Sequence, residues 1–444
     1  METNMQRVEK FSQSITLKAI IIGIMTLLML IPGEMIQNLI CERQKRSEET
    51  IEKINSKWSN AQTINGPVLV IPYTATETND KNKVVYLHHT IKFTPEMLVI
   101  NAKLIPEERH YGIYKSILYK SELEITGNFK KVDFQLPANS QMNKGEAYVR
   151  IGISDLRGMT NNLDFMMNNE HYSAEAGGEQ DVIGQGLVIT LKDFDLSQAG
   201  PLSFKCTMKL NGSSDINFIP IGKTTQVQMN GAWKSPGFIG SFTPEYSMNE
   251  SGFNAKWNIL HFNRNIPEQW FDNQQHSFAD ASFGVNLVDT VNHYQQNMRS
   301  AKYAFMFIAL TFVVFFFVEV LTRKKIHLIQ YLLVGIALIL FYSLLLSISE
   351  QINFAIAYLI ASIATIGLIT IYAHSIFKNK MQTTVLASIL SILYVFLYVV
   401  LQLEDIALLI GSIGLFIILG FIMFFSRKIN WYKNPDQAEK LMIE

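Results

Sequence analysis

The sequence predicts a membrane α-helical bundle of six transmembrane helices, with a large β-rich extracytoplasmic domain inserted between helices 1 and 2. Two observations support this prediction. Nearly every residue in 303–425 is apolar, whereas 41–299 has the charged, aromatic and turn residues of a globular protein. The chain of 444 residues is 48% hydrophobic and only 17% charged, which is little charge for a soluble protein of this length.

The transmembrane helices are predicted from length and hydropathy. A bilayer core about 30 Å thick requires about 20 mostly apolar residues in a helix, because no water is present to satisfy free backbone groups. The segments that meet this requirement are 15–36, 301–321, 328–347, 354–377, 383–401 and 406–425. The first resembles a signal peptide in length, but Pro32, Gly33 and Glu34 follow it without a small-residue cleavage pattern. We therefore expect an uncleaved anchor.

The basic residues predict the orientation, since Lys and Arg accumulate in cytoplasmic loops. With the N-terminus inside, the inside segments hold the basic residues Arg7, Lys10, Lys18, Arg323, Lys324, Lys325, Lys378, Lys380, Arg427, Lys428, Lys433 and Lys440. The short outside loops hold no basic residue and carry Glu350, Glu404 and Asp405. The expected protein is therefore multi-pass with both termini cytoplasmic, and residues 41–300 are translocated, which in a bacterium places them in the periplasm.

These segments divide the chain into four predicted regions. They are an N-terminal tail with helix 1 (1–40), a periplasmic β-rich domain flanked by helical stalks (41–300), a five-helix transmembrane bundle (301–426) and a cytoplasmic tail (427–444). Helical periodicity over 35–58 predicts the first stalk. Asp289 is placed to cap a second stalk, which runs through His293 and Met298 into the next span.

Between the stalks the hydrophobic period changes to two, which is typical of strands. The β-rich or alternating segments are 84–93, 186–192, 202–210 and 225–229, and the turn signals are Asn65-Gly66-Pro67, Asn211-Gly212 and Pro236-Gly237. This pattern predicts an antiparallel sheet structure with one large core or two smaller ones. The stretch 159–180 is rich in Asn, Glu and Gly and is interpreted as a mobile loop.

Glu350 lies within the apolar region, and two interpretations of it stand. It falls in the loop 349–353 between two spans, where a helical hairpin reverses, which is typical of a solvated turn. The alternative is a functional acid at the mouth of a cavity, paired with polar groups such as Tyr358, because ionisable groups at membrane depth often mark functional sites. Glu319 lies one turn before Arg323, so an i, i+4 ion pair explains it.

The motif Ile153-Ser-Asp-Leu-Arg-Gly-Met159 carries the other candidate site. Asp155 and Arg157, at i and i+2, would share one face of a strand. One interpretation is a structural ion pair that closes a sheet edge. The other is a carboxylate and a guanidinium that bind a ligand.

Motifs for catalysis or cofactor binding are missing from the sequence. There is no H-E-x-x-H among the nine histidines and no G-x-S-x-G. Gly222-Lys223-Thr224 matches the last three residues of the phosphate-loop motif G-x-x-x-x-G-K-S/T. The first glycine of that motif is missing here, so a turn between two strands is favoured. The formal net charge is zero, which argues against nucleic acid as a partner. We expect no enzymatic activity, no metal and no cofactor; Cys41 and Cys206 are either unpaired thiols or a disulfide.

Several segments along the chain together resemble one known family. They are NGPVLVIPY (65–73), RHYGIYKSILY (109–119), ISDLRGM (153–159), GSSDINFIPIGKTTQVQMNGAWKSPGFIGSF (212–242), FNRNIPEQW (262–270), KYAFMFIALTFVVFFFVE (302–319), QYLLVGIALILFYSLLLSISE (330–350), LEDIALLIGS (403–412) and NWY (430–432). In this order they resemble the CreD family of bacterial inner-membrane proteins over nearly the whole chain. The resemblance implies a role in cell-envelope integrity and stress tolerance under a two-component system, and implies no catalytic activity.

The chain departs from the pattern of that family at two positions. The family often has His-Pro where this chain has His327-Leu328, and a His where this chain has Gln351. These departures argue against a histidine-dependent role near Glu350.

Three classes of function follow from these observations. The first is a non-enzymatic membrane protein whose β-domain binds or senses an envelope component, with the lipid bilayer and other envelope proteins as further partners. The second is a small transporter or channel whose polar path among helices 2–6 is lined by Ser343, Ser347, Tyr358, Ser362 and Thr365. No interrupted pair of half-helices marks an ion site in it. The third is an envelope hydrolase or transferase, for which no nucleophile and base stand at usable spacing.

Overall fold

A computed structural model describes residues 15–78, 84–131, 136–143, 146–178, 181–192, 201–272, 274, 276–287, 293–322, 326–403 and 406–427. The chain divides into two compact units. The first, here called the membrane unit, comprises Met1–Ser47 and Val291–Glu444. The second, here called the β unit, comprises Glu48–Thr290 and so lies between the two parts of the first in sequence.

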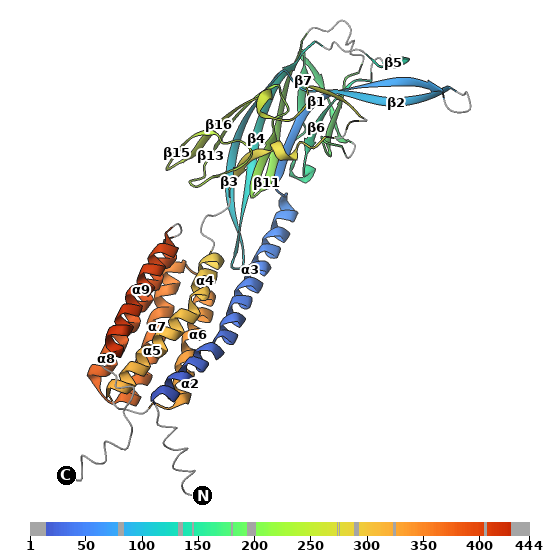
Figure 1. The fold of residues 1–444 in the computed structure, drawn as a ribbon. Coiled ribbons are helices and arrows are strands. Elements are labelled where there is room, and N and C mark those ends of the chain that lie inside the picture. The colour runs from blue at the N-terminus through green and yellow to red at the C-terminus, as the bar shows by residue number, and fades with distance from the viewer. Residues whose placement is uncertain are drawn as a thin grey trace, which may run out of the picture. The chain divides into compact units, whose positions relative to one another are not determined.

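The helices are α2 (Ile15–Leu28), α3 (Leu30–Trp58), α4 (His293–Lys302), α5 (Ala304–Thr322), α6 (Leu328–Ser349), α7 (Phe354–Phe377), α8 (Lys380–Gln402) and α9 (Ala407–Ser426) (Figure 1). Four helices among the described residues are long and apolar enough to span a membrane, namely Leu17–Trp58, α6, α7 and α8. Helices α4 and α5 pass the same test together but are bent by 44°, and Leu409–Phe424 is shorter.

Two features of these helices differ from the sequence prediction. Six spans were predicted, whereas the described residues give four, or five if the bent pair is one span. The second stalk was predicted to run into span two, but the chain bends between α4 and α5, where Tyr303 separates them. The first stalk is confirmed, since α3 continues to Trp58. The predicted cap Asp289 and most of the predicted tail 427–444 lie outside the described residues.

Side-chain caps fix where the apolar helices begin. The Asn353 side chain accepts a hydrogen bond from the backbone N–H of Ala355 at 2.8 Å, at the start of α7. The Asn379 side chain accepts from the N–H of Met381 at 3.0 Å, at the start of α8. Each cap satisfies a donor that the first helical turn leaves free. Lys378 is left-handed, with φ of 47°, and ends α7, so a tight α7–α8 reversal is built into the sequence.

Aromatic side chains fill the interior of the membrane unit. The Phe341 ring lies 4.9 Å from the Tyr394 ring and 5.6 Å from the Tyr358 ring, both edge to face. Phe307 on α5 lies 6.1 Å from Tyr394. All four of these side chains are less than 5% exposed. Close packing of this kind stabilises the bundle by dispersion and leaves little internal space.

The β unit contains two sheets. The strands are β1 (Gln62–Thr78), β2 (Val84–Phe93), β3 (Met97–Tyr111), β4 (Tyr114–Phe129), β5 (Ser140–Met142), β6 (Tyr148–Ile153), β7 (Asp164–Met167), β8 (Glu170–Tyr172), β9 (Ala174–Gly177), β10 (Gly186–Thr190), β11 (Leu202–Ser213), β12 (Asp215–Ile219), β13 (Thr224–Gly231), β14 (Gly237–Gly240), β15 (Glu245–Asn249), β16 (Gly252–Leu260), β17 (Gln269–Phe271) and β18 (Phe283–Asn286). The ten-stranded sheet has the path β14-β18-β12-β1-β6-β10-β9, and the eight-stranded sheet has the order β15-β16-β13-β3-β4-β11-β7-β8.

One continuous hydrophobic core joins the two sheets of the β unit. Val70 and Val149 from the ten-stranded sheet and Ile125, Phe204 and Val227 from the eight-stranded sheet all belong to it. Buried and exposed residues alternate along the strands, as in β11 and β13, because successive side chains point to opposite faces. The β unit is therefore a two-layer structure with one large core.

The predicted β-structure is confirmed in outline and wrong in three details. The predicted strand 84–93 matches β2. The pairs β1–β12 and β13–β3 are parallel, so the sheets are not purely antiparallel. The predicted turn at Asn211-Gly212 lies inside β11, where both residues pair with β4. The predicted loop 159–180 contains β7, β8 and β9, short strands near the sheet edges whose exposed residues gave no apolar alternation.

Candidate functional site

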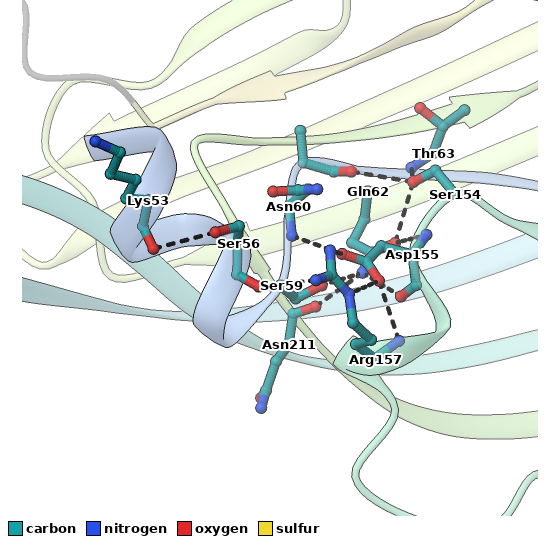
Figure 2. Close-up of polar contacts among 11 residues, drawn as sticks. Lys53, Ser56, Ser59, Asn60, Gln62, Thr63, Ser154, Asp155, Arg157 and Asn211 are labelled. Atoms are coloured by element: carbon teal, nitrogen blue, oxygen red, sulfur yellow. Dashed lines mark hydrogen bonds and ion pairs between the residues drawn. The ribbon is translucent and has the colours of Figure 1, made fainter. Parts of the chain in front are cut away.

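Asp155 lies at a junction of α3, β1 and the end of β6 (Figure 2). Strand β6 ends at Ile153, and a 3₁₀ turn, η1 (Leu156–Gly158), follows with Asp155 as its N-cap. Asp155 and Arg157 therefore do not share a face of a strand, as the sequence predicted. The N-cap is extended and Arg157 belongs to the 3₁₀ turn, which brings the two side chains together.

The Asp155 carboxylate is saturated with donors. Its Oδ1 accepts from Arg157 Nε at 2.9 Å and from the Arg157 backbone N–H at 3.1 Å. Its Oδ2 accepts from Arg157 Nη2 at 2.7 Å and from the Asn60 N–H at 3.0 Å. A carboxylate has about four lone-pair sites, so a ligand finds none open here. Arg157 Nη1 donates to the carbonyl of Ser56 at 2.8 Å, at the end of α3.

These contacts lower the pKa of Asp155 from 3.8 to about 2, chiefly through the side-chain hydrogen bonds from Arg157. Burial acts in the opposite direction, and the backbone N–H groups of Asn60 and Arg157 add to the lowering. The pKa of Arg157 is raised by the same pairing. A carboxylate held ionised in this way braces the junction but is a poor proton donor or acceptor near neutral pH.

Gln62, which the sequence analysis did not single out, lies at the centre of this junction and is fully buried. Its Nε2 donates to Ser59 Oγ at 2.8 Å, to the Asp155 carbonyl at 2.9 Å and to the Asn211 carbonyl at 3.0 Å. Its Oε1 accepts from Ser154 Oγ at 3.2 Å. The sequence gives little indication that Gln62 joins these segments, because the residues it contacts are about 90 and 150 positions away.

Glu350 is the C-cap of α6 and is half-buried. Tyr294 on α4 donates from its hydroxyl to Glu350 Oε1 at 3.2 Å. Next to it, Asn297 Nδ2 donates to Ser349 Oγ at 2.7 Å, and Ser349 Oγ donates to the Leu346 carbonyl. Glu350 therefore lies at a helix end, in a polar contact between α4 and α6, and its partner is a tyrosine that the sequence did not predict.

Tyr358 does not join Glu350. Its hydroxyl donates to the backbone carbonyl of Tyr394 at 2.7 Å, and its ring packs against Phe341 and Tyr398. Tyr358 is 4% exposed. The contact links α7 to α8 inside the aromatic core, so the two membrane residues singled out from the sequence belong to different clusters.

A second acidic cluster lies between α2, α5 and α6. Glu319 is 6% exposed, and its carboxylate accepts from the Lys18 ammonium, from the Ile326 N–H at 2.9 Å and from the Tyr331 hydroxyl at 2.9 Å. Lys18 also donates to the Ile326 carbonyl at 3.0 Å. The predicted partner Arg323 lies outside the described residues. Lys18 is 301 positions from Glu319, which is why no local pattern revealed the pair.

Buried charge in the β unit is likewise paired. Arg150, with a side chain 3% exposed, donates to Asp181 Oδ2 at 2.7 Å and to the Gly184 carbonyl at 2.6 Å. Lys92, 5% exposed, lies 3.4 Å from the same carboxylate oxygen. Buried cations require such partners, because an unpaired charge in the interior is costly.

The segment around Gly222-Lys223, which resembles the end of a phosphate loop, is a turn between β12 and β13, as predicted. The Arg264 side chain is fully buried and donates to the carbonyls of Gly222 and Ile221, each at 3.0 Å. The backbone carbonyls here thus point to a guanidinium. A phosphate site would require N–H groups pointing at the ligand.

The described residues contain no group of three or more His, Cys, Asp or Glu placed to hold a metal ion. Cys41 is exposed and Cys206 is buried in β11, and both are free thiols. Burial raises the pKa of the Cys206 thiol, which makes it unreactive.

Open space is found at surfaces of both units. On the outward face of the eight-stranded sheet are two hollows of about 590 and 610 Å³, which share Asn101 and Gln228. In the membrane unit, a groove of about 390 Å³ lies between α6 and α7 and is lined by Ser343, Ser347 and Thr365. Leucines on the rim of this groove, such as Leu340 and Leu368, are more than half exposed.

Two comparisons with known proteins bear on this arrangement. The family model described as "Inner membrane protein CreD" matches residues 14–432. The chain belongs to the CreD family. It is 31% identical over 419 residues to the Inner membrane protein CreD of Escherichia coli (strain K12), covering 91% of each chain. Together with its apolar helices, this makes the chain a multi-pass inner membrane protein of that family.

One solved structure that matches the chain is a distant one. The native yeast LTA4 hydrolase aligns with 50% of this CreD-family chain and 35% of its own, at 6% identity and a TM-score of 0.20. A TM-score this low does not show a shared fold.

Proposed function

We propose that this protein is a non-enzymatic inner-membrane protein that supports cell-envelope integrity and stress tolerance. In this proposal its β unit is periplasmic and binds or senses an envelope component. The membrane unit anchors it, with both chain termini in the cytoplasm.

The observation that carries the proposal is the different distribution of open space in the two units. The hollows of the β unit lie on an exposed polar sheet face, and each has the size of a ligand site, about 300 to 1,000 Å³. The interior of the membrane unit is instead filled by aromatic rings. The acidic groups at its two polar clusters accept hydrogen bonds from neighbouring helices.

A small transporter or channel is the second candidate, favoured by the groove that Ser343, Ser347 and Thr365 line. Two features make it the weaker one. The exposed leucines at the rim of the groove suit contact with lipid more than a water-filled path. Tyr358, expected in the polar path, donates its hydroxyl to a backbone carbonyl inside the core.

The orientation is tested by thiol labelling in intact cells. In a background with Cys41 and Cys206 replaced by serine, we expect Glu350→Cys to react with a membrane-impermeant maleimide, whereas Lys324→Cys reacts only after permeabilisation. The opposite pattern would remove the periplasmic placement on which the proposal rests.

The envelope role is tested by complementation. A strain that lacks this gene is expected to lose viability in detergent and after osmotic shock, and the wild-type chain is expected to restore it. Survival of the deletion strain equal to that of the parent strain under both stresses would contradict the proposal.

A further inference from the structure

The outward face of the eight-stranded sheet carries polar side chains in rows across neighbouring strands. Gln228 is paired in register with Asn101 on β3 and with Lys256 on β16. Two residues before Gln228 on β13, Gln226 pairs with Asn258 on β16. Two residues after it, Asn230 pairs with Asn254 on β16. Residues paired in register point to the same face. Six amide side chains are thus gathered on one face: Asn101, Gln226, Gln228, Asn230, Asn254 and Asn258.

These amides are available to a ligand. All six are exposed except Asn254, which is half-exposed. Within the part of the chain that the structure describes, none of them makes a side-chain hydrogen bond. Each amide offers two donors and an acceptor with two lone pairs, so the face carries both kinds of hydrogen-bonding group in close array.

Strand stability does not explain this choice of residues. Asn is among the residues depleted in strands, whereas Thr, Val and Tyr are favoured on a half-exposed sheet face. Four of the six amides are asparagines on β3, β13 and β16. Where residues contradict the local preference without a packing gain, a functional site is the expected reason.

The other half of the same face provides an internal contrast. On β4 and β11, Lys205 lies 2.5 Å from Glu124 and Lys209 lies 3.6 Å from Glu122, so these charges neutralise one another. On the amide half, Lys256 and Glu245 are opposed in register. The face therefore presents no excess of either charge. Anionic polymers are bound by clusters of unpaired Arg and Lys, whereas Lys103, Lys205 and Lys209 on this face are paired with glutamates.

Five of the six amides line the two hollows on this face. The first, of about 590 Å³, is lined by Gln226, Gln228 and Asn258. The second, of about 610 Å³, is lined by Gln228 and Asn230 on the amide half and extends over the ion-paired half to Glu122, Glu124 and Lys209. Both include Asn101 and Gln228, so the two hollows lie next to each other over β16, β13, β3 and β4. Three strand spacings of about 4.8 Å give a path about 14 Å long, which is enough for a short run of sugar rings.

From these observations we infer that this face binds a neutral glycan chain, and that the chain is the glycan backbone of the cell wall. Hydroxyl and acetamido groups both donate and accept hydrogen bonds, and so complement the donors and acceptors of the amides. In the wall, the lactyl carboxyl groups of the backbone are largely amide-linked, so the backbone itself is close to neutral. The inference rests on the proposed function and names its ligand class.

The test uses the full-length protein in lipid nanodiscs and purified cell-wall sacculi. We expect the protein to co-sediment with sacculi, with affinity that changes less than about twofold between low and high salt, because no ion pair is involved. Chitohexaose should compete. The variant Asn101→Thr/Gln228→Thr/Asn258→Thr should bind at least about tenfold more weakly, while Lys205→Thr, on the ion-paired half, should bind like wild type.

Three outcomes would overturn the inference. They are no sedimentation of the wild type, sedimentation of the triple variant equal to that of the wild type, and capture by lipopolysaccharide vesicles or an extended peptide in place of sacculi. Threonine is a good strand former, so the triple variant should fold, and its thermal unfolding in detergent checks this.

The inference and the proposed function fail in different ways. If the wild type does not bind sacculi but the triple variant, at normal abundance, fails to complement the deletion strain, the ligand class is wrong and the proposed function stands. If the triple variant loses sacculus binding and still complements fully, the binding site is right and the proposed function is wrong.

Discussion

Glu319 in the membrane unit and Gln228 in the β unit are both polar residues, but their surroundings differ. Both carboxylate oxygens of Glu319 accept hydrogen bonds, from Lys18, Ile326 and Tyr331. Gln228 is exposed on a strand and lines two hollows. A polar group buried at membrane depth must find partners within the protein, whereas one on a water-exposed sheet can stay available for a ligand. The difference suggests a structural role for the first group and a binding role for the second.

The largest effect should follow from breaking the Lys18–Glu319 pair. Lys18→Met leaves the buried Glu319 carboxylate without its cation, and removing one partner of a buried pair costs about 3 to 5 kcal/mol. We expect a large loss of thermal stability for the full chain in detergent. Adding Glu319→Gln should recover most of it, since an amide oxygen still accepts from Tyr331. Lys380→Met, at an exposed helix start, is the control.

If Lys18→Met is as stable as wild type, the pair does not brace the membrane unit. The conclusion that Glu319 has a structural role in the membrane unit would then be wrong.

The next effect concerns Asp155 and depends on pH. Its folded pKa of about 2 is below the ordinary value of 3.8, so its stabilisation is complete above about pH 5 and is lost as pH falls toward 2. We expect Asp155→Asn to lower the free energy of unfolding by about 2 kcal/mol at pH 7. In denaturant titrations, wild type and variant should converge near pH 2. Asp164→Asn, at a carboxylate that is 56% exposed, should change stability by less than about 0.5 kcal/mol.

A difference between Asp155→Asn and wild type that persists unchanged at the lowest pH would show that the ion pair is not its cause. Loss of function with normal stability would instead favour the ligand-binding interpretation of Asp155 and Arg157.

A smaller effect is expected at Tyr358. Tyr358→Phe removes the hydroxyl that donates to the Tyr394 carbonyl and keeps the ring packing, so unfolding in detergent should become easier by about 1 kcal/mol. Envelope tolerance should stay normal. If Tyr358→Phe at normal abundance no longer complements the deletion strain, the transporter or channel hypothesis, with its polar path through the bundle, would be favoured. Tyr398→Phe, at a partly buried ring beside it, is the matched variant.

The smallest effect is expected at Glu350. Glu350→Gln keeps an oxygen that can accept from the Tyr294 hydroxyl, and substitutions of this kind usually change stability by less than about 0.5 kcal/mol. Complementation under detergent or osmotic stress should be normal. Glu404→Gln and Asp405→Asn, outside the described residues, are the matched controls. Loss of function at Glu350 alone, at normal abundance, would show that it is a functional acid.

The sequence predicted the parts of the fold that depend on local periodicity. The alternation over 84–93 located β2, and the helical phase after Met35 located the α3 stalk. The strands in 159–180 were missed because their exposed faces lack apolar alternation. The parallel pairs β1–β12 and β13–β3 join segments far apart in sequence, and no local pattern encodes them.

For the candidate sites, the sequence located charged residues better than their partners. Asp155 and Arg157 are two residues apart, and their pairing was predictable. Glu319 was assigned to the nearest basic residue, but its described cationic partner is Lys18 on another helix. Of the two interpretations of Glu350, the functional one paired it with Tyr358, whereas Tyr294 is its described hydrogen-bond partner. The amide rows were invisible in sequence because they arise only from the register of separate strands.

One measurement tests most directly whether function lies in the β unit. Two variants would be compared in the deletion strain under detergent stress, at matched abundance: Asn101→Thr/Gln228→Thr/Asn258→Thr on the sheet face, and Ser343→Ala/Ser347→Ala/Thr365→Ala in the α6–α7 groove. We predict that the sheet-face variant fails to restore viability and that the groove variant restores it fully. Failure of the groove variant together with full rescue by the sheet-face variant would place the function in the membrane unit and contradict the proposal.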